Sequence, residues 1–458
     1  MFYLTNQKGN NKTLDLYIFF LKNFITTLRS ELSVICESEN DYHYILSQIE
    51  NDNININLFC IEKQLLETPP LSNKELKKFK EIISKKKYNY IENNYDSNDL
   101  YQLAKIIYEK LKLEINKTSK KFIIVNQGVG VFHSVPLVIT QEISNILGVL
   151  IVLPFSSPLK GRLSIYESIY FQNKAVVNDY NENLNNDSLK NNLIIDYLDD
   201  YIQKENDLLI RKNRFFKKYP KFDIQKIINF KHFFQAFYYK IFYRKIFFHN
   251  KKNTKPYILV MLSKKRQWFN AYANQHLNDR KSIIKNIRKN VPSKYNIVLR
   301  SHPRDKYLDD YESMKFLISN DDVKISLYNA FRNDNYEIIN NSKMVIAYGS
   351  SSIIVPLILK KNVIEIGKES LFFPMNNPPI GRIMDGDELK DKFDELFNKK
   401  VSSKKINSYL FSIYNNSYAV THDENVKKKN PFYHFRTQKN TVELVKIILR
   451  FLKRNELI

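Results

Sequence analysis

The sequence predicts an α/β fold with two parallel sheets, each covered by helices, in a chain of 458 residues. Three observations lead to this prediction. Short apolar runs of strand length alternate with longer amphipathic stretches along most of the chain. Residues 257–366 continue this alternation without a break, as expected of a complete nucleotide-binding sheet. The length is sufficient for two or three domains with a sizeable hydrophobic core.

The first part of the chain predicts one sheet. A helical lead-in is expected over residues 1–31, where apolar residues recur at helical spacing. Pro154 is expected to end the last strand of this part and to open a loop over 154–167. The predicted strands are 32–36, 54–61, 122–125 and 149–153, and the main predicted helices are 41–49, 99–113 and 134–146.

Two segments of this first sheet carry candidate functional residues. The turn after strand 122–125 holds Gly128 and Gly130 but lacks the third glycine of a dinucleotide fingerprint, so it fits a plain strand-to-helix turn. Loops after strand ends line the ligand crevice of open α/β sheets. His133 and Glu167 are therefore candidates for acid or base work, with a structural role as the alternative for each. Lys160 and Arg162 lie in the same loop as Glu167.

The second part of the chain predicts a second sheet. Beyond residue 398 the sequence turns irregular and polar, and it ends with an amphipathic helix over 441–453. The predicted strands are 257–262, 295–299, 323–327, 344–347 and 363–366, and the predicted helices are 280–289, 307–318, 336–341 and 353–359.

A Gly-Ser turn follows strand 344–347. Gly349, Ser350, Ser351 and Ser352 connect this strand to a helix, and serine hydroxyls are suited to capping it. Such a turn points N–H groups and hydroxyls at one spot, which favours a phosphate. A well-capped helix with no ligand is the alternative.

A basic His-Pro segment follows strand 295–299 at the same sheet edge. Arg300 and Arg304 offer bidentate contacts to phosphate or carboxylate. His302 lies between them and is suited to donating to a phosphate oxygen or acting as an acid. Together with the Gly-Ser turn, this segment predicts a functional pair for an anionic ligand.

The net charge of +24 predicts an anionic partner. Residues 211–252 concentrate this charge, with Lys and Arg throughout, interleaved aromatic residues, and Asp223 as the single acid. Such a segment can lie on an anionic bilayer or stack on single-stranded nucleic acid. A helix between domains with an aromatic core face remains the third interpretation.

The location is predicted from cysteines and hydropathy. Cys36 and Cys60 offer neither a disulfide framework nor a metal spacing, which favours a reducing cytoplasm and a metal-independent activity. No stretch reaches the roughly 18 apolar residues of a membrane span. Lysines interrupt the N-terminal apolar run, so no cleavable leader is predicted.

With these residues in view, the chain resembles the bacterial capsule polysaccharide biosynthesis family, the GT-B glycosyltransferases related to those of Kps systems. The resemblance lies mainly in residues 256–373, through YILVMLSKKRQ, VLRSHPRD and YGSSSIIVPLILKKNVIEIG. Residues 122–167 resemble the first domain of that family more loosely, through the Asn-Gln-Gly turn that contains Gln127. The helix after the Gly-Ser turn departs from the family, since Ile354-Val355-Pro356-Leu357 replaces its usual Glu-Ala-Leu.

The resemblance implies two Rossmann-like domains with a cleft between them. Residues 1–205 would hold the acceptor, 206–255 would form the basic connector, 256–430 would bind the nucleotide sugar, and 431–458 would pack back on the first domain. Arg300, His302 and the Gly-Ser turn would bind the donor phosphates, with Arg304 beside them. Gln127, Lys160 and Arg162 would line the acceptor side.

The implied reaction is sugar transfer to a lipid-linked or oligosaccharide acceptor at the inner face of the plasma membrane, with residues 211–252 on the anionic surface. No cofactor, metal or nucleic acid is expected. Three alternatives stay open. One is a polymer glycerophosphotransferase of teichoic acid type, another is a nucleic-acid-binding protein, and the third is a non-catalytic sugar-nucleotide-binding or scaffold protein.

Overall fold

A computed structural model gives the structure of the chain. It describes residues 1–5, 11–28, 32–51, 55–83, 97–118, 121–125, 134–159, 162–169, 172–185, 248, 255–262, 280–300, 316–326, 335–347, 353–366, 378–383, 388–398, 402–419 and 438–458. No described helix is long and apolar enough to cross a membrane.

The chain divides into two compact units. Unit 1 contains Met1–Asn178 and Ile413–Ile458, and unit 2 contains Asp179–Ser412. The boundaries predicted at residues 205 and 430 fall outside the described residues, so they stay predictions. Of the basic stretch 211–252 the structure describes Phe248, whose N–H donates to the Ile325 carbonyl at 2.8 Å.

The seven described strands of unit 1 form one mixed sheet in the order β13-β6-β5-β4-β1-β2-β3. The five strands from β3 to β5 are parallel, while β6 and β13 are added antiparallel. These strands are β1 (Phe2–Leu4), β2 (Leu32–Cys36), β3 (Ile56–Cys60), β4 (Phe122–Val125), β5 (Leu150–Ser156), β6 (Arg162–Tyr166) and β13 (Ser417–Ala419).

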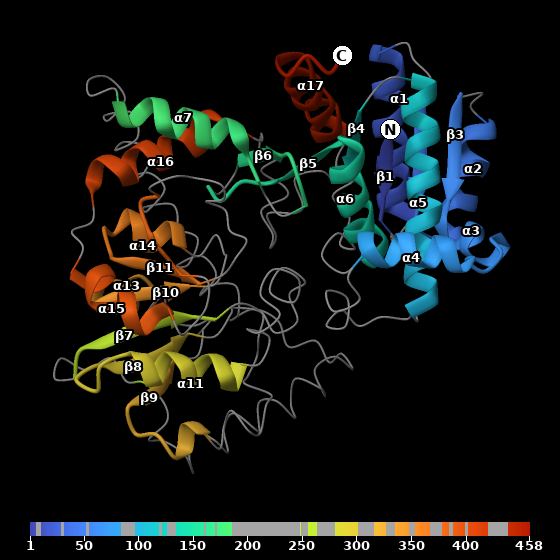
Figure 1. Ribbon diagram of the computed structural model, residues 1–458. Helices are drawn as coiled ribbons and strands as arrows, with labels where there is room; N and C mark the ends of the chain where they lie inside the picture. Colours follow the sequence, from blue (N-terminus) through green and yellow to red (C-terminus); the bar gives the residue numbers. More distant parts are fainter. Residues whose placement is uncertain are drawn as a thin grey trace, which may run out of the picture. The chain divides into compact units, whose positions relative to one another are not determined.

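Helices cover both faces of this sheet. The described helices are α1 (Asn11–Leu28), α2 (Glu39–Asn51), α3 (Ile61–Glu67), α4 (Asn73–Ile82), α5 (Ser97–Thr118), α6 (Val135–Leu147) and α17 (Gln438–Arg454). The core on one face joins α1, α2 and α17 to alternate strand residues such as Phe2, Val34 and Ile124. Figure 1 shows α17 beside α1, so the C-terminal helix lies within the core of unit 1.

Three sequence-based predictions were wrong, two of them in unit 1 and one in the stretch that crosses the boundary between the units after residue 412. The lead-in over 1–31 begins with β1 before its helix, because three apolar residues are too short a run to separate from a helical pattern. β5 continues through Pro154, where β6 is the strand paired with it, so the missing N–H can face the open side. The stretch after residue 398 forms α16 (Ser403–Asn415) and β13.

The six described strands of unit 2 form a parallel sheet in the order β12-β11-β10-β7-β8-β9. Numbered along the chain, this is the order 6-5-4-1-2-3 of doubly wound nucleotide-binding sheets. The strands are β7 (Tyr257–Met261), β8 (Asn296–Arg300), β9 (Val323–Ser326), β10 (Met344–Ala347), β11 (Val363–Ile366) and β12 (Gly381–Ile383).

The helices of unit 2 follow the doubly wound pattern. Apolar residues of α11 (Arg280–Asn290) and α15 (Glu388–Asn398) pack on one face of the sheet. On the opposite face, Tyr257 Oη donates to the Ile338 carbonyl of α13 (Asn335–Asn341) at 2.7 Å. Another described helix is α14 (Ile354–Ile358), and α7 (Lys174–Asn185) and α16 each cross a boundary between the two units. The predicted fold class, two Rossmann-like α/β units with a C-terminal helix returning to the first, is confirmed.

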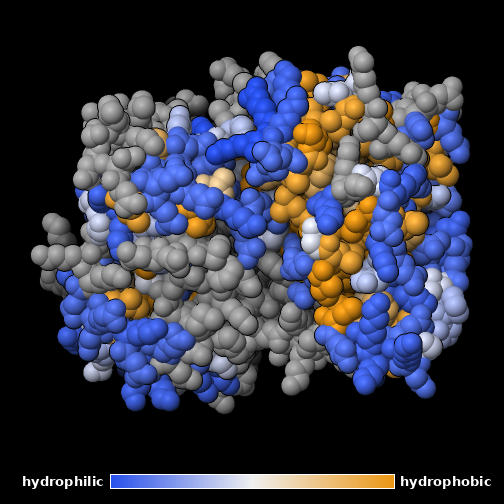
Figure 2. Space-filling view, turned by 45° about the horizontal axis from the view of Figure 1, so that its top comes forward, coloured by the Kyte–Doolittle hydropathy of each residue, from blue (hydrophilic) through white to orange (hydrophobic). Residues whose placement is uncertain are grey.

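The described part of one face of the molecule is largely hydrophilic. On the face drawn in Figure 2, blue residues cover most of the described area, and hydrophobic residues form an orange band in the right-hand half.

Candidate functional site

The strand order of unit 2 defines where a ligand would bind. The chain progresses outward from β7 in one direction through β8 and β9, and in the other through β10 to β12. At such a reversal the loops leave for opposite faces, and the crevice at the carboxyl ends of the strands binds ligands. β7 ends at Met261 and β10 ends at Ala347, so the Gly-Ser segment follows directly from one of the two strands at the reversal.

Arg300 lies at this carboxyl edge as the last residue of β8. Its Nη1 donates to Ser326 Oγ at 2.7 Å, and Ser326 is the last residue of β9. Arg300 is 3% exposed. A buried guanidinium requires partners, and the Ser326 hydroxyl is one that fixes its orientation.

The last row of the sheet places Arg300 next to the reversal. Strand register pairs Ser326 with Arg300, Arg300 with Met261, Met261 with Ala347, and Ala347 with Glu365. Register partners on parallel strands point to the same face, so a buried cation and a buried carboxylate flank the two apolar residues at the reversal. Sequence analysis missed Ser326 and Glu365, although the acid in the apolar run VIEI was a visible signal.

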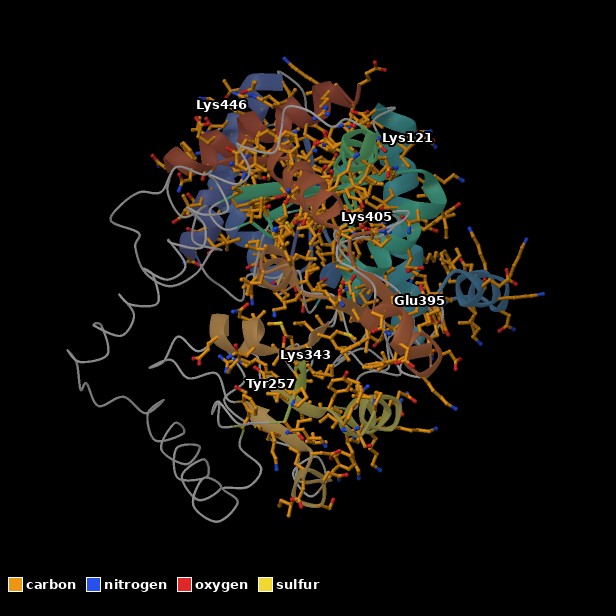
Figure 3. All side chains as sticks on the ribbon, turned by 90° about the vertical axis from the view of Figure 1, so that its left-hand side faces the viewer. Lys121, Tyr257, Lys343, Glu395, Lys405 and Lys446 are labelled. Atoms are coloured by element: carbon orange, nitrogen blue, oxygen red, sulfur yellow. The ribbon has the colours of Figure 1, made fainter. Side chains whose placement is uncertain are left out.

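The opposite edge of this sheet differs in character. Tyr257 begins β7, and Lys343 immediately precedes β10; the two are adjacent in Figure 3. The Lys343 N–H donates to the Tyr257 carbonyl at 3.0 Å, which continues the backbone ladder. Burial raises the pKa of the Tyr257 hydroxyl, so it stays a neutral donor. The contacts at this amino edge are therefore structural.

The remaining predicted residues of the donor side lie outside the described residues. They are His302, Arg304, Gly349, Ser350, Ser351 and Ser352. The helix expected after the Gly-Ser turn is α14, with Ile353 as its N-cap. Pro356 is its third residue, where its missing N–H falls among the four that have no partner within a helix.

Unit 1 has a reversal of its own between β1 and β4. Beside it, the Tyr3 hydroxyl of β1 donates to Glu37 Oε1 at 2.9 Å, and the Ser134 hydroxyl donates to the same oxygen. We call Tyr3, Glu37 and Ser134 the hydroxyl–carboxylate cluster. Glu37 comes immediately after the buried strand β2, a signal that sequence analysis passed over.

Glu167 lies at a different place in this sheet. It follows β6, which runs antiparallel to β5, so the end of β6 points back toward the amino ends of the parallel strands. β6 is three strand spacings from β1, roughly 14 Å. The structure therefore does not bring Glu167 together with the hydroxyl–carboxylate cluster.

The Glu167 side chain is largely enclosed by the protein. Its side chain is 9% exposed, and Lys174 Nζ lies 3.7 Å from its Oε2. Burial raises the pKa of this carboxyl, and Lys174 opposes the rise. Its predicted acid or base role stays a prediction, and the observed contact is an ion pair with the exposed Lys174 at the start of α7.

Arg162 is engaged in structural contacts within unit 1. Its Nε donates to Ser417 Oγ at 2.7 Å, and its Nη2 donates to the Tyr414 carbonyl at 2.9 Å. The guanidinium also lies over the Tyr414 ring, 3.9 Å from its centroid. These contacts fasten β13 to β6, so the geometry supports a structural role for Arg162 and gives no support to the predicted acceptor role.

The other candidates of the first domain, Gln127, His133 and Lys160, lie outside the described residues. Within the part of the chain that the structure describes, no group of three or more His, Cys, Asp or Glu side chains is placed to hold a metal ion. Both cysteines, Cys36 and Cys60, are buried and reduced.

No protein-family model matches the chain, and no curated protein matches it. Among solved structures, KpsC from Thermosulfurimonas dismutans, a beta Kdo 2,7 transferase, is similar at 13% identity over 75% of this chain and 89% of that chain, with a TM-score of 0.34. A glycosyltransferase from Rickettsia africae is similar at 12% identity over 98% of each chain, with a TM-score of 0.30. Anabaena HepE in complex with UDP and glucose is similar at 11% identity over 98% of this chain and 99% of that chain, with a TM-score of 0.28. Values this low establish no shared function, so the case for function rests on the residues of this chain.

Proposed function

We propose that this chain is a GT-B glycosyltransferase that moves a sugar from a nucleotide-activated donor to a growing capsule or surface polysaccharide. The observation that carries the proposal is the carboxyl edge of unit 2. There a nucleotide-binding strand order brings Arg300, oriented by Ser326, next to the reversal point. An oriented cation at this point suits the phosphates of a nucleotide sugar.

The donor phosphates would be bound by several groups at once. Arg300 supplies a fixed positive charge, and Arg304, His302 and the turn from Gly349 to Ser352 follow the strands that end at the same edge. Negative charge develops on the nucleotide as the glycosidic bond to it breaks. Donors and cations already oriented toward that charge stabilise the transition state more than the ground state.

The acceptor side of the proposal rests on less of the structure. Unit 1 would hold a lipid-linked or oligosaccharide acceptor, and residues 211–252 would hold the protein to the anionic inner face of the plasma membrane. Their basic and aromatic composition supports this placement. Phosphate binding by fixed side chains also fits a transfer that needs no metal.

A donor-binding screen tests the proposal. Thermal unfolding would be measured with CMP-, UDP-, GDP- and CDP-linked sugars and with CDP-glycerol. The proteins are the wild type, His302→Ala and the control Lys289→Ala, which removes one exposed charge near the end of α11. We expect one nucleotide sugar to stabilise the wild type and the control but not His302→Ala, because binding only to the folded protein raises its stability.

Other outcomes identify the alternatives. Selective stabilisation by CDP-glycerol would favour a glycerophosphotransferase. Donor binding without any release of nucleotide would favour a non-catalytic binding protein. The charge of +24 supports the nucleic-acid alternative. Stabilisation by a short oligonucleotide that declines steeply with salt, with no response to any nucleotide sugar, would overturn the transferase in its favour.

A further inference from the structure

The hydroxyl–carboxylate cluster fixes Glu37 at the carboxyl edge of unit 1. The Glu37 N–H donates to the Leu4 carbonyl at 3.2 Å, which extends the pairing of β1 and β2 by one residue. β1 is one of the two strands at the reversal point of this sheet. Glu37 therefore lies at the carboxyl edge of the sheet in unit 1, as Arg300 does in unit 2, but it carries the opposite charge.

Two hydroxyls orient the Glu37 carboxylate. Tyr3 and Ser134 both donate to Oε1, one from β1 and one from the N-cap of α6. Ser134 Oγ in turn accepts from the Leu137 N–H at 2.9 Å, so its rotamer is set by the helix. Tyr3 is fully buried, and burial followed by the nearby Glu37 charge raises the pKa of its hydroxyl, which keeps it a donor.

Glu37 also remains accessible, whereas two other carboxylates of unit 1, Glu114 and Glu167, are enclosed. Its side chain is only partly buried. Glu114 is fully buried and accepts from Lys110 Nζ at 2.7 Å and from Ser33 Oγ at 2.6 Å. Glu167 is nearly buried and lies at the far side of the sheet. Among these three, Glu37 combines orientation, access and a position beside the reversal point.

We propose that Glu37 is the catalytic base that accepts the proton of the acceptor hydroxyl, with Tyr3 and Ser134 as positioning residues. This inference rests on the proposed glycosyltransferase function. As the acceptor oxygen bonds to the anomeric carbon of the donor sugar, its proton passes to the Glu37 carboxylate. The bond from that carbon to the nucleotide phosphate oxygen breaks, and its electron pair leaves with the nucleotide. Glu37 then returns the proton to water.

Loss of the base is tested by nucleotide release and sugar transfer. The donor is the nucleotide sugar that stabilises the wild type, and the probe acceptors are octyl glycosides of common sugars. Glu37→Gln should lower kcat about 10²- to 10⁴-fold, the usual contribution of a general base. Its thermal stabilisation by the donor should stay unchanged, because the donor contacts lie in unit 2. Glu109→Gln, which removes an exposed carboxylate of α5, is the matched control and should keep most of the activity. Glu167→Gln is measured alongside it as the variant of the rival carboxylate.

Chemical rescue separates a chemical role from a structural one. Glu37→Ala should regain roughly tenfold or more of its lost turnover with sodium formate, because formate supplies a carboxylate where the base was removed. Tyr3→Phe and Ser134→Ala should lower kcat with little change in the acceptor KM, and Ser134→Thr, which keeps the hydroxyl, should restore it.

The possible failures are distinguishable. A wild type that binds no nucleotide sugar and releases no nucleotide overturns the proposed function and this inference with it. Only the role of Glu37 is overturned if the wild type is active and Glu37→Gln retains its rate. The same holds if the wild type is active and formate does not raise the turnover of Glu37→Ala. Full activity of Glu37→Gln together with loss in Glu167→Gln would assign the base to Glu167.

Discussion

Replacement of Arg300 by methionine tests the donor site most directly. Arg300 is 3% exposed, and its Nη1 donates to Ser326 Oγ at 2.7 Å, which orients the guanidinium. A hydrogen bond to a charged group contributes about 1.5–3 kcal/mol. Since 1.4 kcal/mol corresponds to a tenfold change in the dissociation constant, Arg300→Met should weaken nucleotide-sugar binding about 10- to 150-fold.

Ser326→Ala separates orientation from charge. It keeps the cation but removes the bond that orients it, so we expect a loss of about 0.5–1.5 kcal/mol, roughly 2- to 12-fold in affinity. Isothermal titration calorimetry with the nucleotide sugar gives each dissociation constant. Urea unfolding in parallel shows that each variant is folded, since Arg300→Met removes a partner of Ser326 Oγ and should cost about 1–3 kcal/mol. Equal affinities for wild type, Arg300→Met and the control Lys289→Ala would refute a phosphate-binding role for Arg300.

Two further predictions concern the stability of unit 1. Lys110→Met should lower the free energy of unfolding by about 3–5 kcal/mol, because Glu114, whose side chain is 1% exposed, loses its 2.7 Å partner. Although burial alone would raise it, hydrogen bonds from Lys110 and Ser33 hold the pKa of Glu114 below its usual range. The stability that this carboxylate contributes is therefore present at neutral pH and is lost as the pH falls through the lowered pKa. The difference in urea midpoint between wild type and Lys110→Met should shrink from neutral to acidic pH, and a constant difference would contradict this reasoning. Ile448→Ala should lower the free energy of unfolding in urea by about 2–5 kcal/mol, since Ile448 is 0% exposed and packs between α17 and α1. Lys446→Ala, on the outer face of α17 (Figure 3), should change the free energy of unfolding by less than about 0.5 kcal/mol. Similar losses in the two variants would mean that α17 does not contribute side chains to this core.

Much of the alternation of strands and helices was predictable from local pattern. Four strands have the predicted bounds, because each is a short apolar run of strand length. They are 32–36, 122–125, 344–347 and 363–366. The helix predicted over 441–453 is observed as Gln438–Arg454. Local pattern failed where partners decide the structure, as for β1, which is a strand only because β2 and β4 flank it.

The residues of the candidate site also divide into those that local pattern predicts and those that depend on distant partners. Arg300 could be identified from the sequence because a basic residue that ends an apolar strand is placed at the ligand-binding edge by topology alone. The position of Glu37 directly after a buried strand was a similar signal, but the contacts of Glu37 and Ser326 could not be predicted, because they involve side chains 34, 97 and 26 residues away along the chain. Sequence spacing carries no information on which strands become neighbours.

The sequence by itself therefore determined the alternation of the longer apolar strands with amphipathic helices, the amphipathic C-terminal helix and the cationic edge of unit 2, since these follow from local periodicity and residue chemistry. Only the tertiary structure decided the strand orders, and these determine which edge each residue occupies. The antiparallel pairing of β6 directs Glu167 away from the carboxyl edge, while parallel pairing of β1 and β2 brings Glu37 to Tyr3 and Ser134. Long-range pairing, which local pattern does not encode, therefore decides which of these two carboxylates is a candidate catalytic base.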